Sequence, residues 1–372
     1  MRHLVIDSFD FADLADQAGP GDDTVFVAVR SGLAVGWYGP LAEPVARAVR
    51  GLAPVLVGAD ATDHEGIHDR LAQAAPRSRA GSWAVGALDC AVWDLHAQAE
   101  GSPAAGLLTH EPLQHRITAY SSWLTRDLSH PATADLIAEA SAEGWTFTKW
   151  GLRDRPGASG GALADVLHAA ATAEPIAVDA VGTWPPALAA EFATAADPSA
   201  LVWLEDPAPT HDPRAYQHLR TLPLAVGERL TLADDAPAVL AGIRPAALTL
   251  DVVGCGGLTA ARRILTRTTT PVFPHGRSLQ PGLHLAAAHP DRVLAVEYRL
   301  QWEPGRQHLY AHPVEPDRGH LTLPTATGLG ATPRSAPCLT RPAPCPYEAA
   351  PSPPPQARCS SWTHASKDTT PS

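Results

Sequence analysis

Ionisable residues end seven successive apolar runs of the sequence. They are Lys149, Asp179, Glu205, Glu228, Asp251, His275 and Glu297. Their separations are 30, 26, 23, 23, 24 and 22 positions, which is nearly regular after the second residue. A single acid at such a place is often a loop residue or an arginine partner. Five carboxylates in one apolar cavity would raise one another's pKa values, so we expect a cation among them.

The three consecutive carboxylates favour a divalent metal. Asp179, Glu205 and Glu228 form an all-oxygen ligand set. Mg²⁺ suits such a set because it accepts waters and substrate oxygens at its remaining octahedral positions. Ca²⁺ usually needs more protein ligands. We therefore predict a Mg²⁺ site.

The remaining polar ends can move protons. Asp251 can orient His275 and raise the basicity of its imidazole, and Lys149 would lie across the site from this pair. A metal between two proton-transfer groups indicates removal of a proton next to a carboxylate, with the metal stabilising the enediolate. Glu297 could hydrogen-bond that enediolate if protonated.

A parallel barrel is the fold that brings these residues together. Eight short apolar runs begin with the run at 116–122, and helical patterns separate them. This alternation predicts a (β/α)8-type barrel, in which the carboxyl ends of all strands face one mouth. The first hundred or so residues mix strands and helices. Their strongest helical pattern, at 82–101, places Ala84, Leu88 and Leu95 on one face and ends at Gly101.

Composition excludes several functions. The formal net charge of -11 and the lack of a basic run argue against a nucleic-acid or anionic-membrane partner. No stretch of 18 apolar residues and no secretory pattern is seen, so we expect a cytoplasmic protein. The 5 cysteines match no zinc or disulfide framework.

Lysine is rare in this chain. Lys149 and Lys367 are the only two lysines, against 26 arginines. Because an ammonium can lose its proton near neutral pH and a guanidinium cannot, Lys149 is a candidate active-site residue. Chance survival of one lysine is the alternative.

Together the motifs resemble the enolase superfamily, mandelate racemase/muconate lactonizing enzyme type. The motifs are "VDAVGTW", "WLEDP", "VGERL", "LDVVGCGGLT", "VFPHG" and "VEY", in the family's order and approximate spacing. The resemblance spans roughly residues 1 to 330. It implies a (β/α)7β TIM-like barrel, an α/β fold, with an α+β capping domain that selects the substrate.

The resemblance also implies domain limits. We expect the capping domain at 1–112, the barrel at 113–312 and a return to the capping domain at 313–330. The tail at 331–372 is rich in proline, lacks apolar periodicity and is predicted to be disordered.

Site roles follow from the same resemblance. It implies that Asp179, Glu205 and Glu228 ligate Mg²⁺, that Asp251 and His275 form an acid/base dyad, and that Glu297 contacts the substrate carboxylate region. These positions match the family by residue type.

One position departs from the family's racemases. Those enzymes resemble one another in a Lys-x-Lys triplet after the second strand, whereas this chain reads Lys149-Trp150-Gly151. The surrounding sequence looks more like acid-sugar, rhamnonate-type dehydratases, whose histidine does much of the proton work. We therefore predict a hydro-lyase that converts an acid sugar to a 2-keto-3-deoxy acid. His275 is the expected acid, and the base is either His275 as well or Lys149, which is otherwise an electrostatic contact.

Three further residues are candidates for substrate binding. Arg153 follows the second strand, His211 follows "LEDPAPT", and Trp37 lies in "VGWYGP" beside Tyr38. A structural ion pair, a solvated loop histidine and core packing are their respective alternatives. The polar loop at 12–23 occupies the place of the family's specificity loop.

Two other functions stay open at this stage. A racemase, epimerase or cycloisomerase would use Lys149 and His275 on opposite faces of the substrate. A pseudoenzyme would bind a ligand without turnover, although it has no physical reason to keep three metal ligands and a dyad. The expected partner is a small carboxylate, an acid sugar, and we expect a homo-oligomer.

Overall fold

The protein is described by a computed structural model. It describes residues 4–18, 23–130, 132–208 and 212–335. Two compact units are distinguished, Met1–Cys338 and Leu339–Ser372. The second unit lies outside the described residues.

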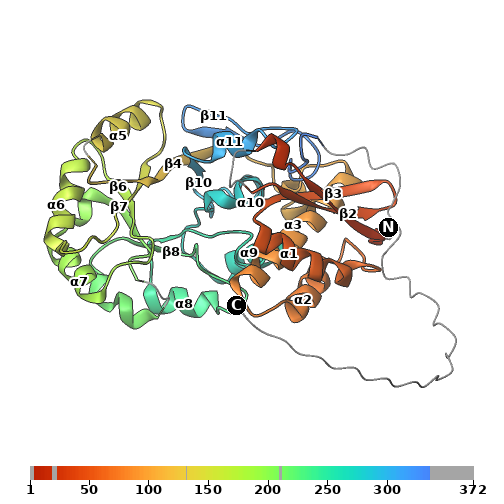
Figure 1. Ribbon diagram of the computed structural model, residues 1–372, viewed down its shortest axis with the longest axis horizontal. Coiled ribbons are helices and arrows are strands. Elements are labelled where there is room, and N and C mark those ends of the chain that lie inside the picture. Colours follow the sequence, from red (N-terminus) through yellow and green to blue (C-terminus); the bar gives the residue numbers. More distant parts are fainter. Residues whose placement is uncertain (1–3, 19–22, 131, 209–211, 336–372) are drawn as a thin grey trace, which may run out of the picture. The chain divides into compact units, whose positions relative to one another are not determined.

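A three-stranded antiparallel sheet begins the chain (Figure 1). Its strands, in the order β1-β2-β3, are β1 (Ser8–Asp13), β2 (Val25–Ser31) and β3 (Ala34–Leu41). The helices that follow are α1 (Glu43–Leu52), α2 (His64–Ala74), α3 (Arg79–Glu100) and α4 (Ala105–Leu108). Gly36 allows β3 to cross α3, since a Cβ there would overlap Ala91 O and Leu95 N. This α+β region agrees with the sequence prediction.

Helix α3 confirms the strongest helical prediction. The Ser78 hydroxyl caps its first turn by accepting from Gly81 N at 3.1 Å. Gly101 ends it with φ 66°, a left-handed conformation that glycine adopts without strain. The predicted apolar face is buried, with Ala84, Leu88 and Leu95 all at 0% exposure.

The barrel region has parallel strands with helices between them. The strands are β4 (Arg116–Asp127), β5 (Thr148–Gly151), β6 (Ile176–Asp179), β7 (Leu201–Glu205), β8 (Leu224–Val226), β9 (Ala247–Leu248) and β10 (Val296–Arg299). The α-helices are α5 (Thr133–Ala142), α6 (Gly160–Ala170), α7 (Pro186–Ala195), α8 (Ala236–Ile243), α9 (Leu258–Arg267), α10 (Leu279–Ala288) and α11 (Glu303–Gln307). Figure 1 shows α5 to α8 outside the strands. This is the predicted α/β architecture.

The seventh predicted strand is present only as a bridge. Val272 pairs in parallel with Leu248 on one side and with Val293 on the other. Backbone hydrogen bonds extend this link, from His275 N to Leu250 O at 2.9 Å and from Glu297 N to Pro274 O at 3.1 Å. Strand β10 in turn pairs in parallel with β4. The parallel order therefore returns to the first barrel strand.

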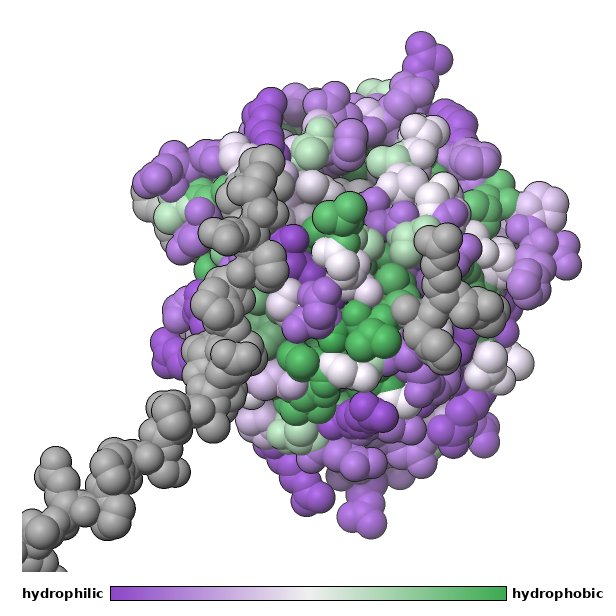
Figure 2. Space-filling view, turned by 90° about the vertical axis from the view of Figure 1, so that its right-hand side faces the viewer, coloured by the Kyte–Doolittle hydropathy of each residue, from purple (hydrophilic) through white to green (hydrophobic). Residues whose placement is uncertain are grey.

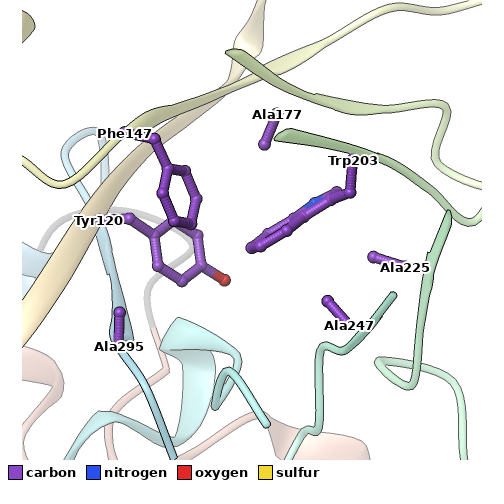
Figure 3. Close-up of a cluster of buried hydrophobic side chains, with 7 residues drawn as sticks. All are labelled: Tyr120, Phe147, Ala177, Trp203, Ala225, Ala247 and Ala295. Atoms are coloured by element: carbon purple, nitrogen blue, oxygen red, sulfur yellow. The ribbon is translucent and has the colours of Figure 1, made fainter. Parts of the chain in front are cut away.

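Aromatic side chains and alanines together fill the barrel interior. The cluster consists of Tyr120, Phe147, Ala177, Trp203, Ala225, Ala247 and Ala295, with Phe273 packed against it. Figure 3 shows Tyr120, Phe147 and Trp203 filling the space between the strands. The ring centroids of Phe147 and Trp203 lie 4.8 Å apart, in an edge-to-face arrangement. This layer forms the floor of the polar site.

After the barrel the chain returns to its beginning. Strands β11 (Pro316–Asp317) and β12 (His320–Thr322) extend the sheet at β4. Leu329 N then donates to Asp94 Oδ1 of α3 at 2.5 Å. Ala331 is fully buried and Arg334 N donates to Leu309 O, so the start of the predicted tail is packed. The rest of that tail, from 336 onward, lies outside the described residues.

The surface of the N-terminal region carries some apolar area. Figure 2 shows this side, with apolar residues near the middle of a largely polar face. Val5, Leu33 and Val57 are exposed large apolar residues of this region.

No helix among the described residues is both long and apolar enough to cross a bilayer. The homo-oligomer stays a prediction.

Candidate active site

Alternation along the strands places the polar residues directly above the apolar layer. Side chains two positions apart on a strand point to the same side. Lys149, Asp179, Glu205 and Glu297 each follow a member of the layer by two residues, for example Phe147 and Trp203. All four polar residues are 0% exposed. The barrel therefore gathers them at one level, as the sequence predicts.

Lys149 lies at the centre of this polar layer. Its Nζ is 2.9 Å from Glu205 Oε2, 3.1 Å from Glu297 Oε1 and 3.7 Å from Asp179 Oδ2. Burial by itself would lower the lysine pKa, but the carboxylates of Glu205 and Glu297 outweigh it and raise the pKa well above its ordinary value. Lys149 is therefore an ammonium in this arrangement.

The three predicted metal ligands lie together. Asp179, Glu205 and Glu228 each offer an oxygen atom, and these atoms lie within 4.8 Å of one another. Strand β8 stops at Val226, and Gly227 takes φ 143°. That glycine conformation interrupts strand alternation and lets Glu228 join the two acids.

The carboxylates fit a divalent cation. Asp179 Oδ2 and Glu205 Oε1 are buried and have no hydrogen-bond partner among the described residues. Burial raises the pKa of both Asp179 and Glu205, which means that their negative charge is costly there. Burial would also raise the pKa of Glu228, but the positive charges of His275 and Lys149 outweigh burial and lower that pKa. A hard cation would offset the charge and satisfy the free oxygens.

His275 faces the same cluster. Its Nε2 is 3.5 Å from Glu297 Oε2 and 3.8 Å from Glu228 Oε2. Asp251 Oδ1 accepts from Val253 N at 3.1 Å and from Gly254 N at 2.8 Å, which fixes its carboxylate in the turn after β9. The predicted pairing of Asp251 with His275 stays a prediction.

Glu297 connects Lys149 with the loop that carries His275. Gly276 N donates to Glu297 Oε2 at 2.6 Å. Burial alone would raise the pKa of Glu297, but Lys149 and His275 outweigh it and lower the pKa below its usual range. In this arrangement Glu297 accepts a hydrogen bond, and its predicted contact with the enediolate stays a prediction.

The structure describes two of the three predicted substrate-binding residues, and neither belongs to this cluster. Arg153 is exposed in the segment after β5. Trp37 is buried on β3, where its backbone N donates to Asp94 Oδ2 at 2.7 Å. His211 lies outside the described residues. Their roles stay predictions.

Two residues near the cluster were not predicted from the sequence. Arg79, at the start of α3, places Nη2 3.9 Å from Glu228 Oε1. Asp206 is 1% exposed, and burial together with Glu228 and Asp179 raises its pKa. Its position directly after Glu205 in "WLEDP" is the one clue that the sequence offers.

Two family models match the chain. The model described as "Enolase C-terminal domain-like" matches residues 132–336. The model for the mandelate racemase/muconate lactonizing enzyme N-terminal domain matches residues 23–109. The chain belongs to the mandelate racemase/muconate lactonizing enzyme family of the enolase superfamily.

Named relatives within this family are acid-sugar dehydratases. An L-talarate/galactarate dehydratase of Salmonella typhimurium is 25% identical over 296 residues, covering 76% of this chain and 71% of the relative. A D-galactonate dehydratase family member of Streptomyces bingchenggensis is 25% identical over 330 residues, covering 75% and 78%. The family recognition made from the sequence motifs is confirmed.

A solved structure of the family shows the same fold. It is an L-talarate dehydratase from Polaromonas sp. JS666 complexed with Mg and L-glucarate. It matches with a TM-score of 0.67 and 26% identity, over 83% of this chain and 89% of that chain. The barrel and capping region are thus those of this enzyme family.

Proposed function

We propose that this chain is a Mg²⁺-dependent acid-sugar dehydratase, a hydro-lyase. The observation that carries the proposal is the cluster of three carboxylates, two of them fully buried, beside both Lys149 and His275. The dehydratases named above support the reaction class. The complex of the Polaromonas enzyme with Mg and L-glucarate supports the metal and the kind of substrate.

Asp179, Glu205 and Glu228 would hold the metal. Mg²⁺ supplies positive charge that stabilises the negative charge developing on the substrate carboxylate as the α-proton leaves. Lys149 would add a second positive charge at the same end, because its Nζ lies 2.9 Å from Glu205 Oε2 and 3.1 Å from Glu297 Oε1. We assign Lys149 this electrostatic role.

His275 would carry the protons. Its Nε2 faces the carboxylate cluster and has no hydrogen-bond partner among the described residues. In the reaction the α C–H bond breaks and its proton goes to a base, then the β C–O bond breaks and the hydroxyl leaves as water after protonation. Tautomerisation of the resulting enol gives the 2-keto-3-deoxy acid. We assign at least the second proton transfer to His275 and the orientation of its ring to Asp251.

Turnover of an acid-sugar library tests this assignment. Mono- and diacid sugars are incubated with Mg²⁺, and keto acid is read with semicarbazide. We expect keto acid from at least one acid, and a loss of roughly 100-fold or more for His275→Asn. His168→Asn, on the exposed side of α6, serves as the control and should keep wild-type activity.

Repeating the screen in D₂O distinguishes the other outcomes. Deuterium at the α-carbon without loss of water would identify a racemase or epimerase. Mg²⁺ binding without turnover or exchange would identify a pseudoenzyme. Full activity of His275→Asn would show that another group is the acid.

A further inference from the structure

A cavity with three arginines adjoins the candidate active site. It has a volume of about 320 Å³. Arg277, Arg299 and Arg306 line it, together with Asp23, Gln301 and Trp302. Such a gathering of guanidinium groups is unexpected in a chain with a net charge of -11. The three arginines differ in how far their charge is already compensated.

Arg306 is the most fully compensated of the three. It donates from Nη2 to Pro40 O at 2.9 Å, and its Nη1 is 3.6 Å from Asp23 Oδ2. Arg299 donates from Nη2 to Glu303 Oε1 at 3.0 Å. Its Nε, however, is buried and has no hydrogen-bond partner among the described residues, although Arg299 is only 5% exposed. A buried donor without an acceptor is costly, so a ligand atom is its natural partner.

Arg277 has no carboxylate within ion-pairing distance among the described residues. Its guanidinium lies over the Trp83 ring, 5.4 Å from the centroid. Arg277 is exposed to the cavity, and partial desolvation and the neighbouring charge of Arg299 lower its pKa, whereas Asp23 acts in the opposite sense. An anion in the cavity would compensate the charge of Arg277 and would also satisfy Arg299 Nε.

The cavity lies next to the proton-transfer residues. Arg299 follows Glu297 by two positions on β10, so both side chains leave the strand on the same side. A Cβ at Gly276 would lie 2.9 Å from Arg299 Cγ, so Arg299 packs against the residue between His275 and Arg277. His275, on one side of Gly276, thus belongs to the candidate active site, and Arg277, on the other side, lines the arginine cavity.

We propose that Arg277 and Arg299 bind the distal carboxylate of a dicarboxylic acid sugar, whose other carboxylate lies at the metal cluster. This inference rests on the proposed dehydratase function and names its substrate class. A guanidinium pairs with a carboxylate through two parallel hydrogen bonds, which a terminal hydroxyl cannot reproduce. The arginine cavity therefore selects diacids over the monoacids that carry a hydroxyl at that end.

Matched acid pairs test the proposal on the full chain with Mg²⁺. Galactarate is compared with galactonate, and glucarate with gluconate, by calorimetric binding and by kcat/KM. We expect wild-type protein to bind at least one diacid more tightly than its monoacid. Arg277→Gln should weaken that diacid roughly 10- to 100-fold and leave the monoacid unchanged within about twofold, because only the diacid loses a charged hydrogen bond. Arg277→Lys should recover part of the loss.

Arg50→Gln is the matched control. Arg50 also lies over an aromatic ring, 5.0 Å from the Phe11 centroid, but outside the cavity. The Arg50→Gln protein should bind both the diacid and the monoacid as the wild type does. Equal weakening of both acids by Arg277→Gln, unchanged diacid binding, or a wild-type preference for monoacids would each overturn the inference.

The same experiment distinguishes failure of the inference from failure of the proposed function. Selective diacid binding without keto acid from any substrate would retain the arginine subsite and reject the dehydratase. Dehydration of a monoacid that Arg277→Gln does not change would retain the dehydratase and reject the subsite. Wild-type protein that binds no acid of either pair would reject the subsite as well.

Discussion

The ammonium of Lys149 lies 2.9 Å from Glu205 Oε2, and both residues are fully buried. This contact joins a proposed metal ligand to a cation that also reaches Glu297 at 3.1 Å. One lysine thus compensates part of the negative charge that five barrel strands bring together. Lys149, one of only two lysines in the sequence, therefore has an electrostatic reason to occupy this position.

Replacing this lysine by an apolar residue should destabilise the metal-free protein. Lys149→Met leaves Glu205 and Glu297 buried without their cation, which costs about 3 to 5 kcal/mol of unfolding free energy. Mg²⁺ should recover part of this loss, because a divalent ion at the same carboxylates replaces the missing charge. Urea unfolding with and without Mg²⁺ measures both effects.

Lys149→Arg serves as the comparison because it keeps the charge. It should be more stable than Lys149→Met without Mg²⁺, although the larger guanidinium will disturb the site. If Lys149→Met unfolds like the wild type in the absence of Mg²⁺, the charge argument is wrong.

Calorimetric titration with Mg²⁺ should identify its ligands. Asp179→Asn removes one of the three clustered carboxylates and should weaken Mg²⁺ binding roughly 10-fold or more, since charge dominates the affinity for hard cations. Asp206→Asn is the informative control. Asp206 is also a buried acid, but it does not belong to the group of atoms within 4.8 Å. Its substitution should leave the affinity nearly unchanged, and a comparable loss would make Asp206 a ligand.

Much of the architecture could be predicted from local pattern. The helix predicted at 82–101 is α3 (Arg79–Glu100), and Asp179 and Glu205, predicted to end apolar runs, end β6 and β7, because apolar spacing alone decides which face is buried. The segment at 271–275 has only a bridge at Val272, where a full strand was expected. Its two prolines, at 271 and 274, lack the N–H groups that a regular ladder needs.

The site could be predicted in its members but not in its contacts. The three carboxylates could be predicted because each follows the end of an expected strand. Parallel strands place all these ends at one mouth of the barrel. The approach of Lys149 to Glu205 joins residues 56 positions apart, and Arg79 reaches Glu228 from the N-terminal region. Such pairs depend on how helices and loops pack over the barrel, which no local periodicity encodes. The arginine cavity is missed for the same reason.

Acid should destabilise the protein partly through His284. This histidine is fully buried, and burial lowers its pKa to about 4. Its Nδ1 accepts from Ala105 N at 3.0 Å, which requires an unprotonated nitrogen. The unfolded chain, with a histidine pKa near 6.5, binds the proton first as pH falls. The stabilising contribution is therefore complete above about pH 6.5 and decreases toward pH 4, by about 3 kcal/mol in total.

His284→Asn isolates this effect. The asparagine oxygen can replace Nδ1 as the acceptor from Ala105 N, but it does not titrate. Urea unfolding at pH 7 and pH 4.5 should therefore show a smaller loss of stability for the variant than for the wild type. Equal pH dependence of the two proteins would exclude His284 as the source.

Two helical glycines should respond in opposite directions to substitution by alanine. Gly86 lies where α3 packs against the segment after Asp251, and a Cβ there would overlap Val253 O and lie 2.9 Å from Gly257 N. Gly86→Ala must therefore displace that segment, at a cost of about 1 to 3 kcal/mol. Because Val253 N and Gly254 N hold Asp251 Oδ1, the displacement should also lower kcat.

Gly51, in α1, has no atom within 4 Å of its Cβ position. Gly51→Ala should stabilise the protein by roughly 0.5 to 1 kcal/mol and leave kcat unchanged, because it only removes conformational freedom from the unfolded chain. Denaturant unfolding and turnover of both variants measure the contrast, and a Gly86→Ala protein with wild-type stability and kcat would show that the contact between α3 and this segment does not position Asp251.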